Sequence, residues 1–288
     1  MPRFVRPPFS PVGGRAEMAV PPWPLGSWKT VLLEWKVASI LPRPVPSPSA
    51  LFTANWSLML INLLPDFFAV LNSTDRTAAY LRYFDAHRPL LEAYWHNYVL
   101  DPDGPHFPEV VRSAAMADRS DLRAMLERTD VVMLARQTEQ ACAELLRADV
   151  DLDVVLMVGV GAANAGELVV EGTGVAFVCL EHFTSVMNPE TQGLGLDPEL
   201  IPLWLAHEIA HGIRYTSPTS QSEMRTVIDE AGGYYSYWET GRQVRLRELL
   251  VNEGLAIHVS RAISPGHAAW EYFGYGRRHY ARVREMEP

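Results

Sequence analysis

The sequence is poor in cysteine and in positive charge, and each shortage excludes a class of protein. Its 288 residues include two cysteines, Cys142 and Cys179, which lack the spacing of a zinc knuckle or a redox motif, so we expect no disulfide framework. Lys and Arg number 25 against 34 Asp and Glu, a formal net charge of -9. Because phosphate contacts need a basic surface, we expect no nucleic-acid partner. The cysteine usage favours a reducing, cytoplasmic location.

The sequence also lacks an apolar run long enough to cross a membrane. Its most apolar stretch, 51–64, is interrupted by Asn55 and Asn62 and is followed by Pro65-Asp66. A spanning helix needs about 20 mainly apolar residues, so a buried strand or core segment is the better interpretation. The stretch also lies too deep in the chain for a secretory signal and has no small-residue cleavage site. We therefore expect no membrane partner.

The first 50 residues differ in composition from the rest. They contain 11 of the 22 prolines and carry a local charge of +4, so the remainder carries -13. A proline-rich stretch such as 42–49 cannot sustain a helix or a central strand. We predict a disordered or loosely ordered segment over 1–50 and one domain over 51–288, which is long enough for a large core because 48% of the chain is hydrophobic.

The pattern within 51–288 indicates an α+β fold. Residues 51–150 are mainly helical, with an aromatic stripe over 80–98 that we interpret as core. Short runs rich in β-branched residues predict a small meander of strands within 152–180. Further helices are predicted over 107–128, 131–147, 198–215, 244–263 and 267–285. Helices, then a small sheet, then helices is an α+β order, and 151–288 would contain the sheet and the metal-binding helices.

The helix over 198–215 has clear end signals. Asp197 can accept hydrogen bonds from the free amides of the first turn, and Pro198 suits the first helical position. Glu199 favours the positive end of the helix dipole. The helix must stop before Ser217-Pro218, because a residue before proline disfavours helical backbone.

This helix carries the pattern His207-Glu-Ile-Ala-His211. Residues four apart share one helix face, so His207 and His211 can direct two imidazoles at one ion. Glu208 is offset by about 100° around the helix, where its carboxylate can reach a water at the metal without joining the histidines as a ligand. Its natural role is general base. In the alternative interpretation these are hydrogen-bonded core or surface residues of an α+β protein without metal.

Two downstream carboxylates compete to be the third ligand of a catalytic metal, which also needs an open position for water. Glu230 lies 19 residues after His211, a spacing familiar among zinc peptidases, but glycines follow it and weaken its helical setting. Glu253 lies in the middle of a well-patterned helix, where we expect Gly254 to let two helices approach closely. Spacing favours Glu230, and local setting favours Glu253.

The block Asn252-Glu-Gly-Leu-Ala256, following a His-Glu-x-x-His helix, resembles the gluzincin zinc peptidases. From about Met59 to the C-terminus the chain is similar to a bacterial family of predicted zinc-dependent proteases of unknown function, although the specific motifs are the two blocks alone. The resemblance implies a zincin-like domain with a small mixed sheet and an active-site helix. It also implies Zn²⁺ as cofactor. By this resemblance the zinc ligands would be His207, His211 and Glu253, and the general base would be Glu208.

One position departs from the pattern of this family. Thermolysin-like enzymes place an acidic residue four positions after the ligand glutamate to orient a histidine, and here that position is Ile257. Support for the ligands must therefore come from elsewhere. We interpret His182 and His258 as ordinary polar residues and not as ligands.

The resemblance implies two further features. A late tyrosine or histidine would stabilise the oxyanion, and the candidates are Tyr272, Tyr275, His279 and Tyr280. A sheet edge beside the active helix would hold the substrate backbone as an added strand, and our candidate edge is Val175 to Leu180.

The function expected from these features is a zinc-dependent peptidase that acts on a peptide or protein substrate. The alternative is a catalytically silent gluzincin-like binding or regulatory module. An intact Glu208 favours the enzyme, because an inert descendant has no chemical need for the base.

Overall fold

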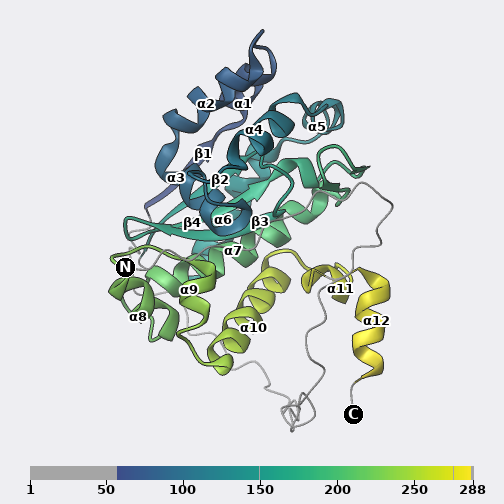
Figure 1. The fold of residues 1–288 in the computed structure, drawn as a ribbon. Helices are drawn as coiled ribbons and strands as arrows, with labels where there is room; N and C mark the ends of the chain where they lie inside the picture. Colours follow the sequence, from purple (N-terminus) through teal and green to yellow (C-terminus); the bar gives the residue numbers. More distant parts are fainter. Residues whose placement is uncertain (1–56, 149, 275, 287–288) are drawn as a thin grey trace. The chain divides into compact units, whose positions relative to one another are not determined.

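A four-stranded mixed sheet forms the centre of the fold (Figure 1). The structure is a computed structural model that describes residues 57–148, 150–274 and 276–286, so the predictions for 1–50 lie outside the described residues. The strand order is β1-β2-β4-β3. The strands are β1 (Ser57–Asn62), β2 (Asp151–Met157), β3 (Ala165–Val170) and β4 (Thr173–Cys179). Strands β1, β2 and β4 are parallel, and β3 is antiparallel to β4 at one edge.

The sheet confirms the α+β class and corrects two expectations about strand placement. Strand β1 comes from the apolar stretch read as a strand or core segment. The predicted meander is wrong, because β2 pairs with β4 in parallel and β3 folds to the outside. The predicted edge over 175–180 is also wrong, because β4 lies between β2 and β3. An apolar run marks a buried strand, but it does not show which neighbours cover it.

The helices before the main strands supply most of the aromatic core. They are α1 (Leu64–Leu71), α2 (Arg76–Ala86), α3 (Arg88–Tyr94), the π-helix η2 (Trp95–Val99), α4 (Phe107–Met116), α5 (Ser120–Leu126) and α6 (Val131–Leu146). The predicted helix over 107–128 is two helices, because the backbone becomes extended at Ala117. Tyr80, Tyr83, Tyr94 and Trp95 are buried, which confirms the aromatic stripe as core.

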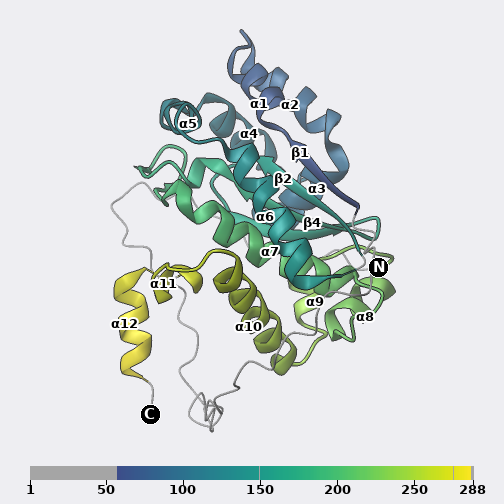
Figure 2. The same ribbon diagram turned by 180° about the vertical axis from the view of Figure 1, so that it is seen from behind.

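Helices cover both faces of the sheet. On one face, Phe177 of β4 makes edge contacts with the rings of Tyr94 and Tyr98, at centroid distances of 5.4 and 5.1 Å. On the other face α7 (Ile201–Thr216) packs against β2, β3 and β4, and α6 packs beside it (Figure 2). The approach is close at Gly212, where an added Cβ would lie 2.4 Å from the Cδ1 atom of Leu152.

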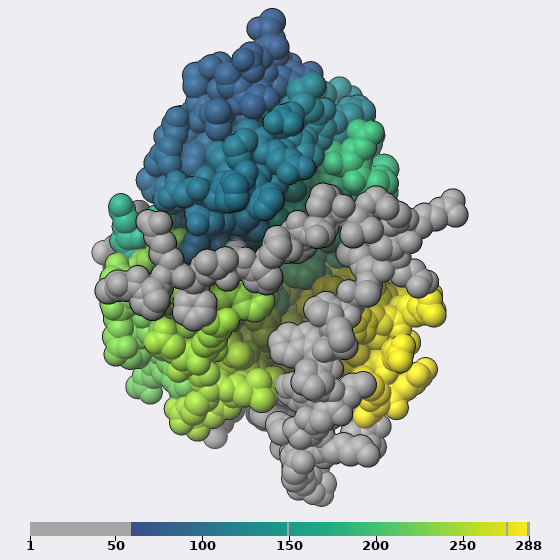
Figure 3. All heavy atoms as spheres, viewed as in Figure 1, coloured from purple at the N-terminus to yellow at the C-terminus, as the bar shows by residue number. Residues whose placement is uncertain are grey.

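The C-terminal part adds a group of helices beyond α7. They are α8 (Glu223–Glu230), α9 (Tyr237–Gly241), α10 (Leu246–Ile263), α11 (Ala269–Tyr272) and α12 (Arg277–Glu285). The predicted helix over 267–285 is therefore two helices, separated near Gly274, whose φ of 66° lies in the left-handed region. In the space-filling view the blue atoms of the early helices and the green atoms of α8 to α10 occupy separate parts of the visible face (Figure 3).

Smaller features complete the described structure. A loop after β4 contains the short turn Leu180–His182 and a two-stranded ribbon of β5 (Met187–Asn188) and β6 (Gly193–Leu194). Cys142 and Cys179 are buried free thiols, as expected. Among the helices of the described ranges, none is both long and apolar enough to span a bilayer.

Candidate metal centre

Helix α7 begins and ends close to the predicted residues. Asp197 Oδ1 accepts a hydrogen bond from the Glu199 amide at 3.0 Å, at the start of a short 3₁₀ turn, Pro198–Leu200, that leads directly into α7. The helix ends at Thr216, and Ser217 has non-helical backbone angles before Pro218. The end signals therefore place both histidines in the helix interior, where their spacing of four residues puts them on one face.

His207, His211 and Glu253 lie together between α7 and α10. Both histidines are buried, with ring centroids 4.7 Å apart. The Oε2 and Oε1 atoms of Glu253 lie 3.4 Å from His207 Nε2 and 3.7 Å from His211 Nε2. One ligand atom from each residue lies within 4.8 Å of the others. Among the described residues, these three side chains form the one cluster of His, Cys, Asp and Glu groups that could hold a metal ion.

The chemistry of these three side chains fits zinc. Two imidazole nitrogens and one carboxylate oxygen are a donor set that Zn²⁺ takes in catalytic sites, with bonds of about 2.0–2.2 Å. Tetrahedral ligands at that bond length lie about 3.3–3.5 Å apart, close to the separations measured from Glu253. The Glu253 side chain is 60% exposed. Solvent therefore reaches the site from that side, as an open fourth position requires.

Glu230, which the spacing favoured, is not part of this group. It is exposed at the last residue of α8. Helices α7 and α10 run antiparallel, so that His211 lies opposite Glu253 and Arg214 lies opposite Glu248. The expected role of Gly254 is wrong, because an added Cβ there would meet no atom within 4 Å.

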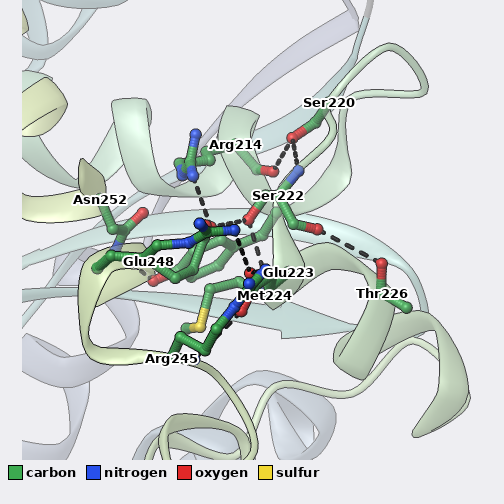
Figure 4. A network of polar contacts seen from close by, with 11 residues as sticks. Arg214, Ser220, Ser222, Glu223, Met224, Thr226, Arg245, Glu248 and Asn252 are labelled. Atoms are coloured by element: carbon green, nitrogen blue, oxygen red, sulfur yellow. Dashed lines mark hydrogen bonds and ion pairs between the residues drawn. The ribbon is translucent and has the colours of Figure 1, made fainter. Parts of the chain in front are cut away.

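An ion pair and its hydrogen bonds fix α10 against α7 close to the metal cluster (Figure 4). The Arg214 guanidinium donates to Glu248 Oε1 at 2.5 Å, and the Ser222 hydroxyl donates to the same oxygen at 2.6 Å. The Arg214 and Glu248 side chains are largely buried. Glu248 lies on the same helix as Glu253. This contact therefore fixes the position of Glu253 along the α7–α10 interface relative to the two histidines.

His211 is supported by Asn252 and Tyr215. The rings of His211 and Tyr215 stack with centroids 6.0 Å apart and an interplanar angle of 21°. Asn252 Nδ2 donates a hydrogen bond to the Tyr215 hydroxyl at 2.9 Å, which fixes the ring that stacks on His211. These residues supply the orienting contact that Ile257 cannot make. Burial lowers the pKa of His211, and the neighbouring His207 adds to the effect, so its imidazole is held neutral, the form that binds a metal.

Glu208 is buried on the sheet side of α7, beside a second acid. It lies close enough to Glu167 of the edge strand β3 for the two carboxyl groups to interact electrostatically. Burial raises the pKa of Glu208 well above its usual value, and the charges of Glu167 and Glu253 raise it further. For Glu253 the partial burial of the side chain acts in the same direction, but its contact with His207 and the charges of both histidines outweigh this effect and lower its pKa. The two glutamates are therefore suited to different tasks, one to proton transfer and the other to charge pairing.

The outer edge of β3 beside Glu208 is covered by other residues of the chain. The Tyr98 hydroxyl accepts a hydrogen bond from the Glu167 amide at 3.1 Å. The same oxygen lies 2.9 Å from the Glu167 carbonyl and 3.1 Å from its Oε2, to either of which it can donate. Farther along the edge the Tyr235 amide donates to the Val169 carbonyl at 3.1 Å. The backbone of this edge is thus already hydrogen-bonded.

Asn97 holds this cover in place. Its Nδ2 donates to the Tyr235 carbonyl at 3.1 Å, and its Oδ1 accepts from the Tyr237 amide at 2.8 Å. The Gly166 position accommodates the Tyr98 ring, because an added Cβ would lie 2.6 Å from its Cζ and hydroxyl atoms.

Comparison with known proteins does not place the chain in a family. No family model matches the sequence, no curated protein matches it, and no solved structure matches its fold. The geometry of the site therefore carries the functional argument.

Of the four late oxyanion candidates, one has a structural role and one lies outside the described residues. Tyr272 is buried, and its hydroxyl donates to the Ser264 carbonyl at 2.7 Å, which gives it a structural role. Tyr280 of α12 stacks on Phe273. His279 lies on the same helix, and Tyr275 lies outside the described residues. Neither His182, which is buried beside Glu181, nor the exposed His258 belongs to the metal cluster.

Several site residues were missed by the sequence reasoning. Glu167 is the one charge in an apolar strand and is nine-tenths buried, a signal that could have marked it. Tyr215 lies four residues after His211, so helical spacing could have found it. Tyr237 is half-exposed, and its pKa is raised by burial first and then by the charges of Glu167 and Glu253. No local pattern marks Tyr98 or Tyr237, because both reach the site through tertiary packing.

Proposed function

We propose that the protein is a zinc-dependent peptidase with a zincin-like fold. The observation that carries the proposal is the convergence of His207, His211 and Glu253 around one point, with the buried carboxyl of Glu208 on the same helix. The three ligands would be these two histidines and Glu253. The donor set, the open side at Glu253 and the separate carboxyl of Glu208 are what hydrolysis by an activated water requires.

In the proposed mechanism the chain supplies the base and the positioning. Zinc, when bound, would polarise the carbonyl of the substrate and make water more acidic. Glu208 takes the proton of the attacking water and passes it to the leaving amine. Its raised pKa brings the carboxyl closer to the range in which one group can both accept and return a proton near neutral pH. Tyr237 is a candidate for stabilising the oxyanion, together with the late residues Tyr275, His279 and Tyr280.

The covered edge of β3 affects how a substrate could bind. An extended peptide that pairs with this edge would lie near Glu208, because Glu167 of the same strand is close enough to raise its pKa. Tyr98 and Tyr235 occupy the outward backbone groups at Glu167 and Val169. A substrate strand would have to displace them. This cover is the observation that favours the alternative function, a catalytically silent binding or regulatory module.

A single substitution tests the proposed mechanism. We expect Glu208→Gln to retain zinc and to abolish hydrolysis of a peptide library, because the amide keeps the shape of the side chain but cannot act as a base. Wild-type hydrolysis should also stop with a chelator and return with added zinc. Full activity in Glu208→Gln would overturn the mechanism. A wild-type protein that binds zinc but cleaves nothing in the library would favour the silent module.

The cellular setting is also a proposal. Both cysteines are buried free thiols, which fits a reducing compartment. We propose a cytoplasmic location, which fluorescence microscopy of the tagged full-length chain can test.

A further inference from the structure

Glu167 lies at the centre of a group of polar side chains that joins the proposed base to a proposed ligand. Its Oε1 accepts a hydrogen bond from the Tyr215 hydroxyl at 3.2 Å, and its Oε2 lies 3.1 Å from the Tyr98 hydroxyl. Tyr215 in turn accepts from Asn252 at 2.9 Å, and its ring stacks on that of His211 with centroids 6.0 Å apart. Glu208 also lies close enough to Glu167 for the charge of Glu167 to raise its pKa.

An acidic residue is unusual at a position such as Glu167 if its role is only structural. Glu167 is nine-tenths buried, as is Glu208. Burying two acidic groups side by side costs free energy, and a functional role would explain why both are kept. The contacts of Tyr98 and Tyr215 hold both oxygens of Glu167, so the side chain is fixed and can fix its neighbour in turn.

We propose that Glu167 is a positioning residue that orients Glu208 and, through the Tyr215 ring that stacks on it, the imidazole of His211. The role rests on the proposed function, because it is defined by the base and the ligand of that site. Glu167 itself does not touch the metal ligand atoms. Residues that orient ligands and bases in this way change metal affinity or activity by about 10–100-fold when they are replaced.

The test compares Glu167→Gln with Glu171→Gln in the full-length protein. Glu171 is exposed and follows the same strand, so it controls for a change of charge. The zinc dissociation constant is measured with a competing chelator, and kcat and KM are measured separately on one cleaved peptide at saturating zinc. For Glu167→Gln we expect weaker zinc binding by about tenfold or more, kcat lower by about 10–100-fold and KM within about threefold. Glu171→Gln should match the wild type.

Measurements without turnover separate this proposal from the proposed function. A double-mutant cycle for zinc affinity pairs Glu167→Gln with Tyr215→Phe, and non-additive effects are expected because the two residues act through one chain of contacts. If the wild type binds zinc but cleaves no peptide, the proposed function fails, while this cycle still decides the role of Glu167 at His211. Wild-type zinc affinity and kcat in Glu167→Gln would overturn the positioning role. Additive effects in the cycle would overturn it as well.

Discussion

Arg214 of α7 and Glu248 of α10 form a largely buried ion pair at 2.5 Å, close to the proposed ligands. His211 precedes Arg214 by three residues and Glu253 follows Glu248 by five. The pair therefore connects the two helices at the level where their ligands meet. Ser222 donates to the same carboxylate oxygen, so the contact also fixes the start of α8.

Removing one member of this pair should destabilise the protein and weaken the metal site. Glu248→Ala leaves the Arg214 charge buried without its partner, and we expect a loss of about 3–5 kcal/mol in the free energy of unfolding, measured by urea denaturation. The double variant Arg214→Met, Glu248→Met should recover most of that loss, because it leaves no charge unpaired. A single variant as stable as the wild type would show that the pair does not hold α10.

Gly212 of α7 and Gly254 of α10 should respond in opposite ways to substitution by alanine. In Gly254→Ala the new methyl group meets no atom within 4 Å, so the higher helix propensity of alanine should stabilise the protein by about 0.5–1 kcal/mol. In Gly212→Ala the methyl group would lie 2.4 Å from Leu152 Cδ1, and we expect a net loss of stability because the core is closely packed there. Thermal unfolding of both variants checks the contrast. Equal shifts of the two melting temperatures would contradict the packing described here.

The pH dependence of the metal-free protein should reveal the burial of Glu208. Its pKa is raised on folding, so the folded state holds a proton that the unfolded state loses above about pH 4.3. The stabilisation from this group is complete below that pH and is lost as pH rises through the folded pKa. Glu208→Gln resembles the protonated form, so its stability advantage over the wild type should grow as pH rises from 4.5 to 8. Urea titrations at several pH values measure this difference, and a constant difference would contradict the raised pKa.

How far the sequence predicts this molecule depends on the range of the interactions involved. The ends of α7 and the shared face of His207 and His211 follow from local rules of capping and helical spacing, and the structure confirms both. The approach of Glu253, and not Glu230, depends on the antiparallel packing of α7 and α10, which is set by residues 34 apart such as Arg214 and Glu248.

The order of the strands in the sheet also depends on interactions between distant residues. The apolar runs predicted strands, but the position of β4 at the centre depends on pairing with β2, which a single run of residues does not encode. The closure of the β3 edge by Tyr98 joins residues that are 69 apart in the sequence. Contacts of this kind appear only once the chain is folded.

Replacing Tyr98 should open the edge of β3. Tyr98→Phe removes the hydroxyl that bonds to the amide of Glu167 and lies against its carbonyl, so we expect faster hydrogen exchange at the Glu167 amide and a stability loss of about 1–3 kcal/mol. Under the proposed function KM for an extended peptide should fall, because the substrate strand no longer has to displace this group. Hydrogen exchange over Ala165–Val170 by mass spectrometry, with peptide kinetics, checks both parts. Unchanged exchange would show that the Tyr98 hydroxyl does not protect the edge.

Metal content is the most direct test of the central claim that His207, His211 and Glu253 hold a zinc ion. The wild type, Glu253→Ala and Glu230→Ala are purified without added zinc and measured by elemental analysis beside protein concentration. We predict about one zinc per chain in the wild type and in Glu230→Ala, and little or none in Glu253→Ala. No zinc in the wild type, or a loss of zinc in Glu230→Ala with retention in Glu253→Ala, would contradict the assignment.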